Sequence, residues 1–136
     1  MADASWALQK AVHAALVADA DVLAALGGAR VYDHVPRGAE YPYVTIGQTT
    51  VRDWSTGSET GGEHVLTLHV WSKAAGRGET QAVIGAVRSA LHDKALELDG
   101  HRLVNLRHEF SEARREPDGE RFHGLVRLRA VTEPLS

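Results

Sequence analysis

The sequence contains no cysteine among its 136 residues, which excludes disulfides, thiolate metal sites and cysteine nucleophiles together. It has no apolar run approaching the roughly 18 residues of a membrane-spanning helix. Its first ten residues show no basic segment followed by an apolar one, so we expect no secretory signal. A strong excess of positive charge is also lacking. With 15 basic residues against 18 acidic ones, a general affinity for nucleic-acid phosphates is not expected. These absences predict a protein that is made and kept inside a cell and does not enter a membrane.

What is present is ordinary for one globular domain. A hydrophobic fraction of 43% and a charged fraction of 24% exclude wholesale disorder. The length suits a single domain covering residues 1–136, with enough chain to bury one core. Basic charge is concentrated late in the sequence, where residues 101–129 carry seven arginines and five acidic side chains.

An amphipathic helix is predicted near the N-terminus. Leu8, Val12 and Leu16 repeat at the spacing of one helix face. Asp3 or Ser5 can cap this helix, because their side-chain oxygens accept hydrogen bonds from its first free amides.

Two further helices are predicted by the same signals. A short one is expected to begin after Asp19 and to end at the Gly27–Gly28 pair. A longer one is expected from Glu79 to about His92, where apolar residues again repeat at helical spacing. We interpret Gly85, inside this helix, as a place where the helix packs closely on a sheet.

The remaining segments read as strands, because they are rich in β-branched and aromatic residues. The predicted strands are Val31–Tyr32, Tyr43–Val51, His64–Trp71, Arg102–Phe110 and Arg121–Val131. Since both faces of His64–Trp71 are largely apolar or aromatic, we expect this strand to be central. Glu116–Gly119, with proline second and glycine fourth, predicts a tight turn between the last two strands. The predicted fold class is therefore α+β, a mostly antiparallel sheet with helices packed on one face.

No catalytic or cofactor motif is found. The eight histidines include no His-Glu-x-x-His pattern, and His69, His108 and His123 can converge only if their strands are neighbours. The phosphate-loop and dinucleotide glycine patterns are incomplete, and no Gly-x-Ser-x-Gly elbow occurs. We expect no metal, no cofactor and no enzymatic activity. A small enzyme built on histidines and carboxylates is kept as an alternative, and so is a module that binds a small ligand or nucleic acid.

A polar, glycine-rich segment at residues 53–62 has no periodicity and is predicted to be a flexible loop. It contains Trp54, which has nothing local to pack against. Two interpretations stay open: Trp54 folds back on the body of the protein, or it waits for a partner, as aromatic interface anchors do.

Arginines and acids alternate along the predicted last hairpin, where His123, Arg127 and Arg129 are expected to face solvent or a partner. Cross-strand ion pairs on an exposed face are one interpretation of this pattern. A subunit interface whose charges set the orientation is the other. Our candidate interface residues are Asp53, Trp54, Glu59, Arg114, Arg115, Arg121, Arg127 and Arg129.

The order of several short segments adds a resemblance that extends over most of the chain. These segments are Ala15–Leu23, Gly28–Pro36, Tyr41–Gly47, Val70–Ser72, Gly78–Glu79 with Ala90–Leu91, Leu98–Val104 and Arg129–Glu133. In this order they resemble the tail-completion or tail-terminator proteins of long-tailed phages, prophages and gene transfer agents.

The resemblance implies a structural protein in the neck region of a virion or phage-like particle, made in the bacterial cytoplasm. It implies a ring, commonly of six identical subunits, at the head-proximal end of the tail tube. The partners would then be other copies of the chain, the tail tube protein and the head–tail connector, with DNA passing through the lumen without specific binding. It implies no catalysis and no cofactor. A head-closure or neck protein of the same particle is the close alternative.

Overall fold

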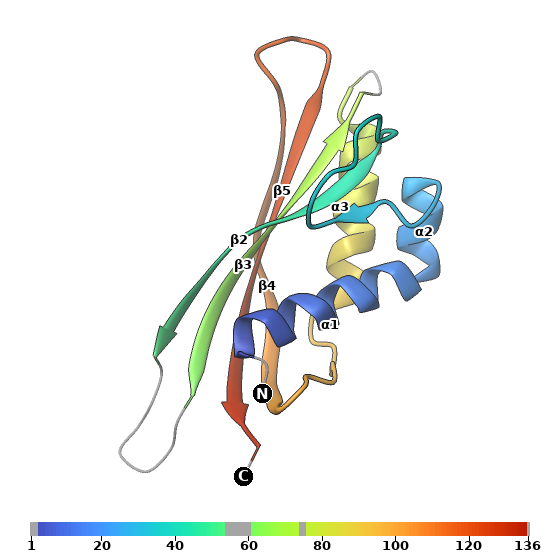
Figure 1. The fold of residues 1–136 in the computed structure, drawn as a ribbon. Helices are drawn as coiled ribbons and strands as arrows, with labels where there is room; N and C mark the ends of the chain where they lie inside the picture. The colour runs from blue at the N-terminus through green and yellow to red at the C-terminus, as the bar shows by residue number, and fades with distance from the viewer. Residues whose placement is uncertain (1–2, 54–60, 74–75, 136) are drawn as a thin grey trace.

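The computed structural model describes residues 3–53, 61–73 and 76–135. In this part of the chain, three helices lie on one face of a five-stranded sheet (Figure 1). The helices are α1 (Ala4–Ala18), α2 (Ala20–Leu26) and α3 (Gly78–Leu91). The strands are β1 (Val31–Tyr32), β2 (Tyr43–Asp53), β3 (Gly62–Ser72), β4 (His101–Arg115) and β5 (Phe122–Pro134).

The strand order is β1-β2-β3-β5-β4, which places β3 at the centre of the sheet as predicted. Only the short β1 pairs in parallel, with β2, and the other three pairings are antiparallel. Helix α3 carries the chain from β3 across to β4, and β5 then returns between them. The predicted α+β class with helices on one face is confirmed.

The first two helices begin and end at capping residues that the sequence analysis had identified. An Asp3 carboxylate oxygen accepts from the Ser5 backbone amide at 3.0 Å, so Asp3 and not Ser5 caps α1. An Asp19 carboxylate oxygen accepts from the Val22 amide at 3.0 Å and caps α2 in the same way. Helix α2 ends at Gly27, which is left-handed with φ 80°.

The core fills the space between the helices and the covered face of the sheet. Leu66, Leu68 and Val70 of β3 are fully buried there, and apolar residues from α1 and α3 complete the same cluster. Burial of this apolar area is the main force that holds the layers together. The apolar stripes predicted for both helices are confirmed.

The close approach between α3 and the sheet occurs at a different glycine from the one expected. A Cβ at Gly85 would meet nothing within 4 Å, so the interpretation of Gly85 was wrong. A Cβ at Gly124 of β5 would instead lie 2.9 Å from carbons of Ile84 and Thr80 on α3. The close approach therefore requires a glycine on the strand β5 and not on the helix α3.

Four strands, β2, β3, β4 and β5, are longer than predicted. Asp53 pairs with Gly62, so β2 and β3 occupy both ends of the segment expected to be a loop. Strand β4 continues to Arg115, and its hairpin with β5 extends beyond the neighbouring strands (Figure 1). The predicted turn closes this hairpin, where the Gly119 amide donates to the Glu116 carbonyl at 2.9 Å. No helix within the described ranges is long and apolar enough to cross a membrane.

Candidate assembly surfaces

The sheet has a second face, which the three helices leave uncovered (Figure 1). Side chains alternate between the two faces of a strand, so Thr67, His69 and Trp71 of β3 lie on this open face. Register places Leu125 opposite His69 and His123 opposite Trp71 on β5. The open face therefore carries polar and aromatic side chains beside a few aliphatic ones such as Leu125, whereas the covered face is mainly aliphatic.

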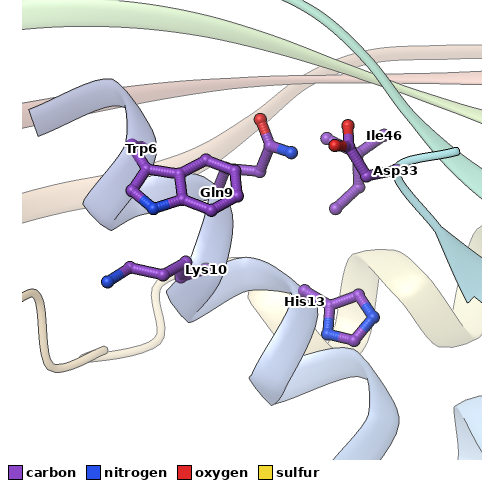
Figure 2. A pocket seen from close by; sticks show the side chains of 6 residues that line it. All are labelled: Trp6, Gln9, Lys10, His13, Asp33 and Ile46. Atoms are coloured by element: carbon purple, nitrogen blue, oxygen red, sulfur yellow. The ribbon is translucent and has the colours of Figure 1, made fainter.

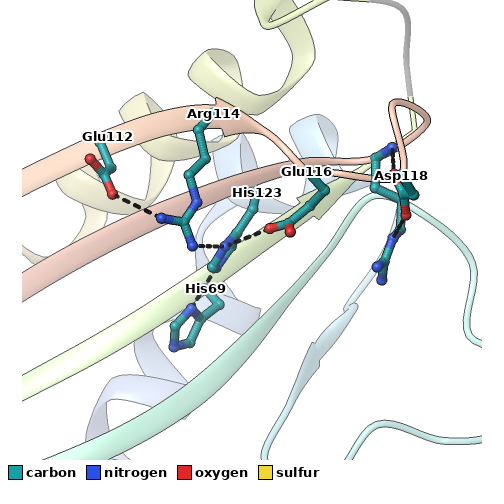
Figure 3. Close-up of polar contacts among 7 residues, drawn as sticks. His69, Glu112, Arg114, Glu116, Asp118 and His123 are labelled. Carbon is teal, nitrogen blue, oxygen red and sulfur yellow. Dashed lines mark hydrogen bonds and ion pairs between the residues drawn. The ribbon is translucent and has the colours of Figure 1, made fainter.

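Two histidines meet on the open face near the turn of the β4–β5 hairpin. His69 Nδ1 lies 2.7 Å from His123 Nε2, and His123 Nδ1 lies 3.0 Å from a Glu116 carboxylate oxygen (Figure 3). A carboxylate only accepts, so neutral His123 donates from Nδ1 to Glu116 and accepts from His69 at Nε2. Arg114 Nη2 is 3.4 Å from the same His123 Nδ1, where two donors face each other. Arg114 therefore acts there as a nearby charge.

Burial lowers the pKa of both histidines. For His69 desolvation is the main cause of the lower pKa, followed by electrostatic effects of His123 and Arg114. For His123 desolvation again leads, and the Glu116 carboxylate opposes it. His123 lies on the open face as expected but is only 7% exposed, so it does not face solvent, and a contact with a partner stays a prediction.

A stack of rings extends this cluster toward the hairpin turn. The Trp71 and His123 rings are parallel within 1°, with centroids 4.1 Å apart. The Arg121 guanidinium carbon lies 5.4 Å from the centre of the Trp71 ring. Arg121 is held in turn by Asp118 at 2.7 Å, and backbone and side-chain hydrogen bonds lower the pKa of Asp118 to about 2. The turn is thereby attached to β3.

The predicted arginines do not form one patch. Arg114 and Arg121 lie at the cluster just described, but Arg115 packs over the Phe122 ring and Arg127 over the Phe110 ring. Arg129 reaches Glu63 of β3 at 2.6 Å. These five arginines thus contact rings, the turn and β3, whereas Arg102 of β4 does pair with Glu133 of β5, as the interpretation of cross-strand ion pairs predicts.

The other candidates lie at the opposite end of β2. Asp53 is the last residue of that strand and pairs with Gly62. Trp54 and Glu59 lie outside the described residues, so the two interpretations of Trp54 stay predictions.

The third histidine considered for a metal site lies elsewhere. His108 is opposite Leu128 in register and so points to the covered side of the sheet, where its Nε2 lies 3.1 Å from Ser111 Oγ. His69 and His123 converge and His108 does not. Within the described ranges no three histidines or carboxylates are grouped so as to hold a metal ion.

Two hollows flank the helix layer, and sequence reasoning missed both. A cleft of about 630 Å³ is lined by Arg88, Ser89 and His92 of α3 and by His108 of β4. A smaller hollow of about 230 Å³ lies beside α1, and Figure 2 shows its lining side chains: Trp6, Gln9, Lys10, His13, Asp33 and Ile46. Trp6 does carry a signal in the sequence, because it falls outside the apolar stripe of α1 and a large aromatic there must be exposed.

The comparisons with known proteins cover nearly the whole chain. The family described as tail completion protein gp17 matches residues 10–133. The chain belongs to this family. One similar solved structure is a chain in the virion of a native gene transfer agent particle, 34% identical, with a TM-score of 0.90. That match covers 98% of this chain and 99% of the other.

A second similar structure is the gp17 protein of bacteriophage SPP1, which is 25% identical with a TM-score of 0.64. The match covers 98% of this chain and 91% of the phage protein. No curated protein matches the chain. As a tail completion protein, it is a structural component of a phage-like particle. The resemblance drawn from the order of short segments is confirmed, and so is the predicted localisation to a virion or phage-like particle.

Proposed function

We propose that this tail completion protein forms a ring, a homohexamer, at the head-proximal end of a tail tube. The ring stops polymerisation of the tube and joins the tail to the head connector. The observation that carries the proposal is the end-to-end similarity to a chain of a gene transfer agent virion. The proposed partners are other copies of the chain, the tail tube protein and the connector. DNA passes through the lumen without specific binding, and no catalytic step is involved.

The architecture suits such a task. In a ring, one side of each subunit binds the opposite side of the next subunit, and the ring closes when this contact has been repeated around it. The two sides of a subunit must therefore differ. The sheet ends at β4 on one side and at β1 and β2 on the other, so its two edges differ. The long β4–β5 hairpin projects past the neighbouring strands and offers a contact surface to the next layer of the particle (Figure 1).

The experiment is to remove the gene from the producing strain and image the particles by negative-stain electron microscopy. We expect overlong tails, and restoration of normal particles when the full-length gene is supplied. Tails of normal length that remain unjoined would instead support a head-closure protein. Normal, head-joined particles in the deletion strain would overturn both readings.

A further inference from the structure

The two hollows beside the helix layer lie at opposite edges of the sheet. Helix α1 packs on β1 and β2, and α3 packs on β3, β5 and β4. The cleft between α3 and β4 therefore opens at the β4 edge, and the hollow beside α1 opens at the β2 edge. A contact between them can form only between two copies of the chain.

The cleft at the β4 edge favours an anionic or aromatic guest. Its lining includes no carboxylate, and Arg88 is exposed and makes no ion pair with any residue that the structure describes. Its two histidines are already engaged, since His92 Nδ1 accepts from the His108 amide at 3.0 Å and His108 Nε2 lies 3.1 Å from Ser111 Oγ. The neighbouring Asp93 carboxylate lies 3.3 Å from His92 Nε2 and 3.6 Å from Arg107 Nε. Arg88 is the group left to bind a partner.

The hollow at the β2 edge presents complementary groups. Trp6 is 48% exposed, a large apolar surface for one side chain. Asp33 is exposed and makes no ion pair within the described ranges. The other polar groups have internal partners: His13 Nε2 lies 3.0 Å from the Val31 carbonyl and Lys10 lies 3.9 Å from Asp99. The side chains left for a partner are an indole and a carboxylate.

We propose that Trp6 and Asp33 of one copy dock into the cleft of the next, with Arg88 as their common partner. A guanidinium can bind a carboxylate along its edge and cover an indole with its face. Tryptophan and arginine are also the residue types that most often dominate interfaces. Because both halves of the contact lie on one chain and on opposite edges, the contact is heterologous and repeats until a ring closes. This inference rests on the ring of the proposed function and names its surfaces.

The absence of cysteine allows a direct test by crosslinking. Gln9→Cys places a thiol beside the hollow, and Ser89→Cys places one beside the cleft. The double variant, treated with a short bismaleimide, is expected to give a ladder from dimer up to the closed ring. A mixture of the two single variants should stop at dimers, and each single variant alone should stay monomeric. Failure of the folded double variant to form a ladder, or equal crosslinking by one single variant, would overturn the proposal.

Charge exchange provides the second arm, in the same double-cysteine background. Arg88→Glu or Asp33→Arg alone is expected to reduce the crosslinked fraction by about tenfold, and the two together should restore it. Arg77→Glu, at the other end of α3, is the matched control and should leave the ladder unchanged. Circular dichroism and urea midpoints confirm that each variant folds. Reductions by the single changes without restoration by the pair would overturn the proposed pairing.

The two proposals fail separately. A ladder with normal particles in the gene-deletion strain would overturn the terminator function and leave the contact in place. Overlong tails in the deletion strain, with no ladder from the double variant, would support the terminator function and overturn the proposed contact.

Discussion

The two faces of the sheet are built from the same strands but are held by different interactions. On the covered face, Leu66, Leu68 and Val70 are buried against helices, and close packing of aliphatic groups supplies the stability. On the open face, Trp71 is stacked on His123, and Arg129 is paired with Glu63. An uncovered sheet face can therefore be ordered by polar and aromatic pairs between its own strands.

The largest effect is expected from the covered face. Leu68→Ala should lower the free energy of unfolding by about 2–5 kcal/mol, because it leaves a cavity beneath the helices. Val65→Ala is the matched change on the same strand, where the side chain is half-buried on the open face. It should cost less than about 1.5 kcal/mol, measured by urea unfolding of both variants. Equal losses would contradict the contrast between the faces.

A smaller effect tests the close approach of α3 to the sheet. Gly124→Ala should cost about 1–3 kcal/mol, because the new Cβ would lie 3.1 Å from Val70 Cβ, which cannot rotate away. Gly85→Ala meets nothing within 4 Å and should gain up to about 1 kcal/mol from helix propensity. Thermal unfolding of the two variants gives the comparison. A destabilising Gly85→Ala would restore the packing role first expected there.

On the open face, the Arg129–Glu63 pair should contribute more than a solvated pair does. Arg129→Met should cost about 1 kcal/mol, since it leaves a half-buried Glu63 carboxylate without its nearest cation. The Arg52 side chain is 82% exposed and lies 3.8 Å from the same Glu63, so Arg52→Met should change stability by less than about 0.5 kcal/mol. Urea midpoints of the Arg129→Met and Arg52→Met variants, measured at low and high salt, separate the contributions of the two ion pairs. Equal losses would show that burial does not strengthen this pair.

The smallest effect on stability is expected from a change of pH. The pKa values of His64, His69 and His123 all lie below the usual 6.5, with burial as the first cause. The unfolded chain then binds more protons, so stability is complete above about pH 6.5 and declines as the pH falls toward the folded-state values.

Urea midpoints at pH 7.5 and 5.5 should show this decline. His64 belongs to the covered face, where Asp3 opposes and His101 adds to the lowering of its pKa. On the open face, His69 faces Arg114, and His123 faces Glu116, Arg114 and Glu112. His64→Gln and His123→Gln should each flatten part of the pH profile. A flat profile in the unaltered protein would rule out the contribution from all three histidines.

Sequence reasoning predicted the covered half of the molecule well, because its signals are local. Apolar side chains that repeat every 3.6 residues identified the helix stripes, and alternation every two residues identified the strand faces. The Asp3 and Asp19 caps could be predicted from the few residues that follow each of them. The open face could not be predicted in the same way. Its contacts join His69 to a residue 54 positions away, and they depend on the register of three strands. Periodicity marks which residues share a face but does not show which of them touch.

The insertion of β5 between β3 and β4 has a consequence for how the chain is made. Until β5 has been synthesised, β4 has no strand beside it, and the sheet exists as two separate pieces. The β1–β2 edge belongs to the piece that is made first, but the β4 edge joins the sheet only when β5 pairs with both β3 and β4. A nascent chain emerging from the ribosome cannot present the two edges together, so folding itself delays assembly until the subunit is whole.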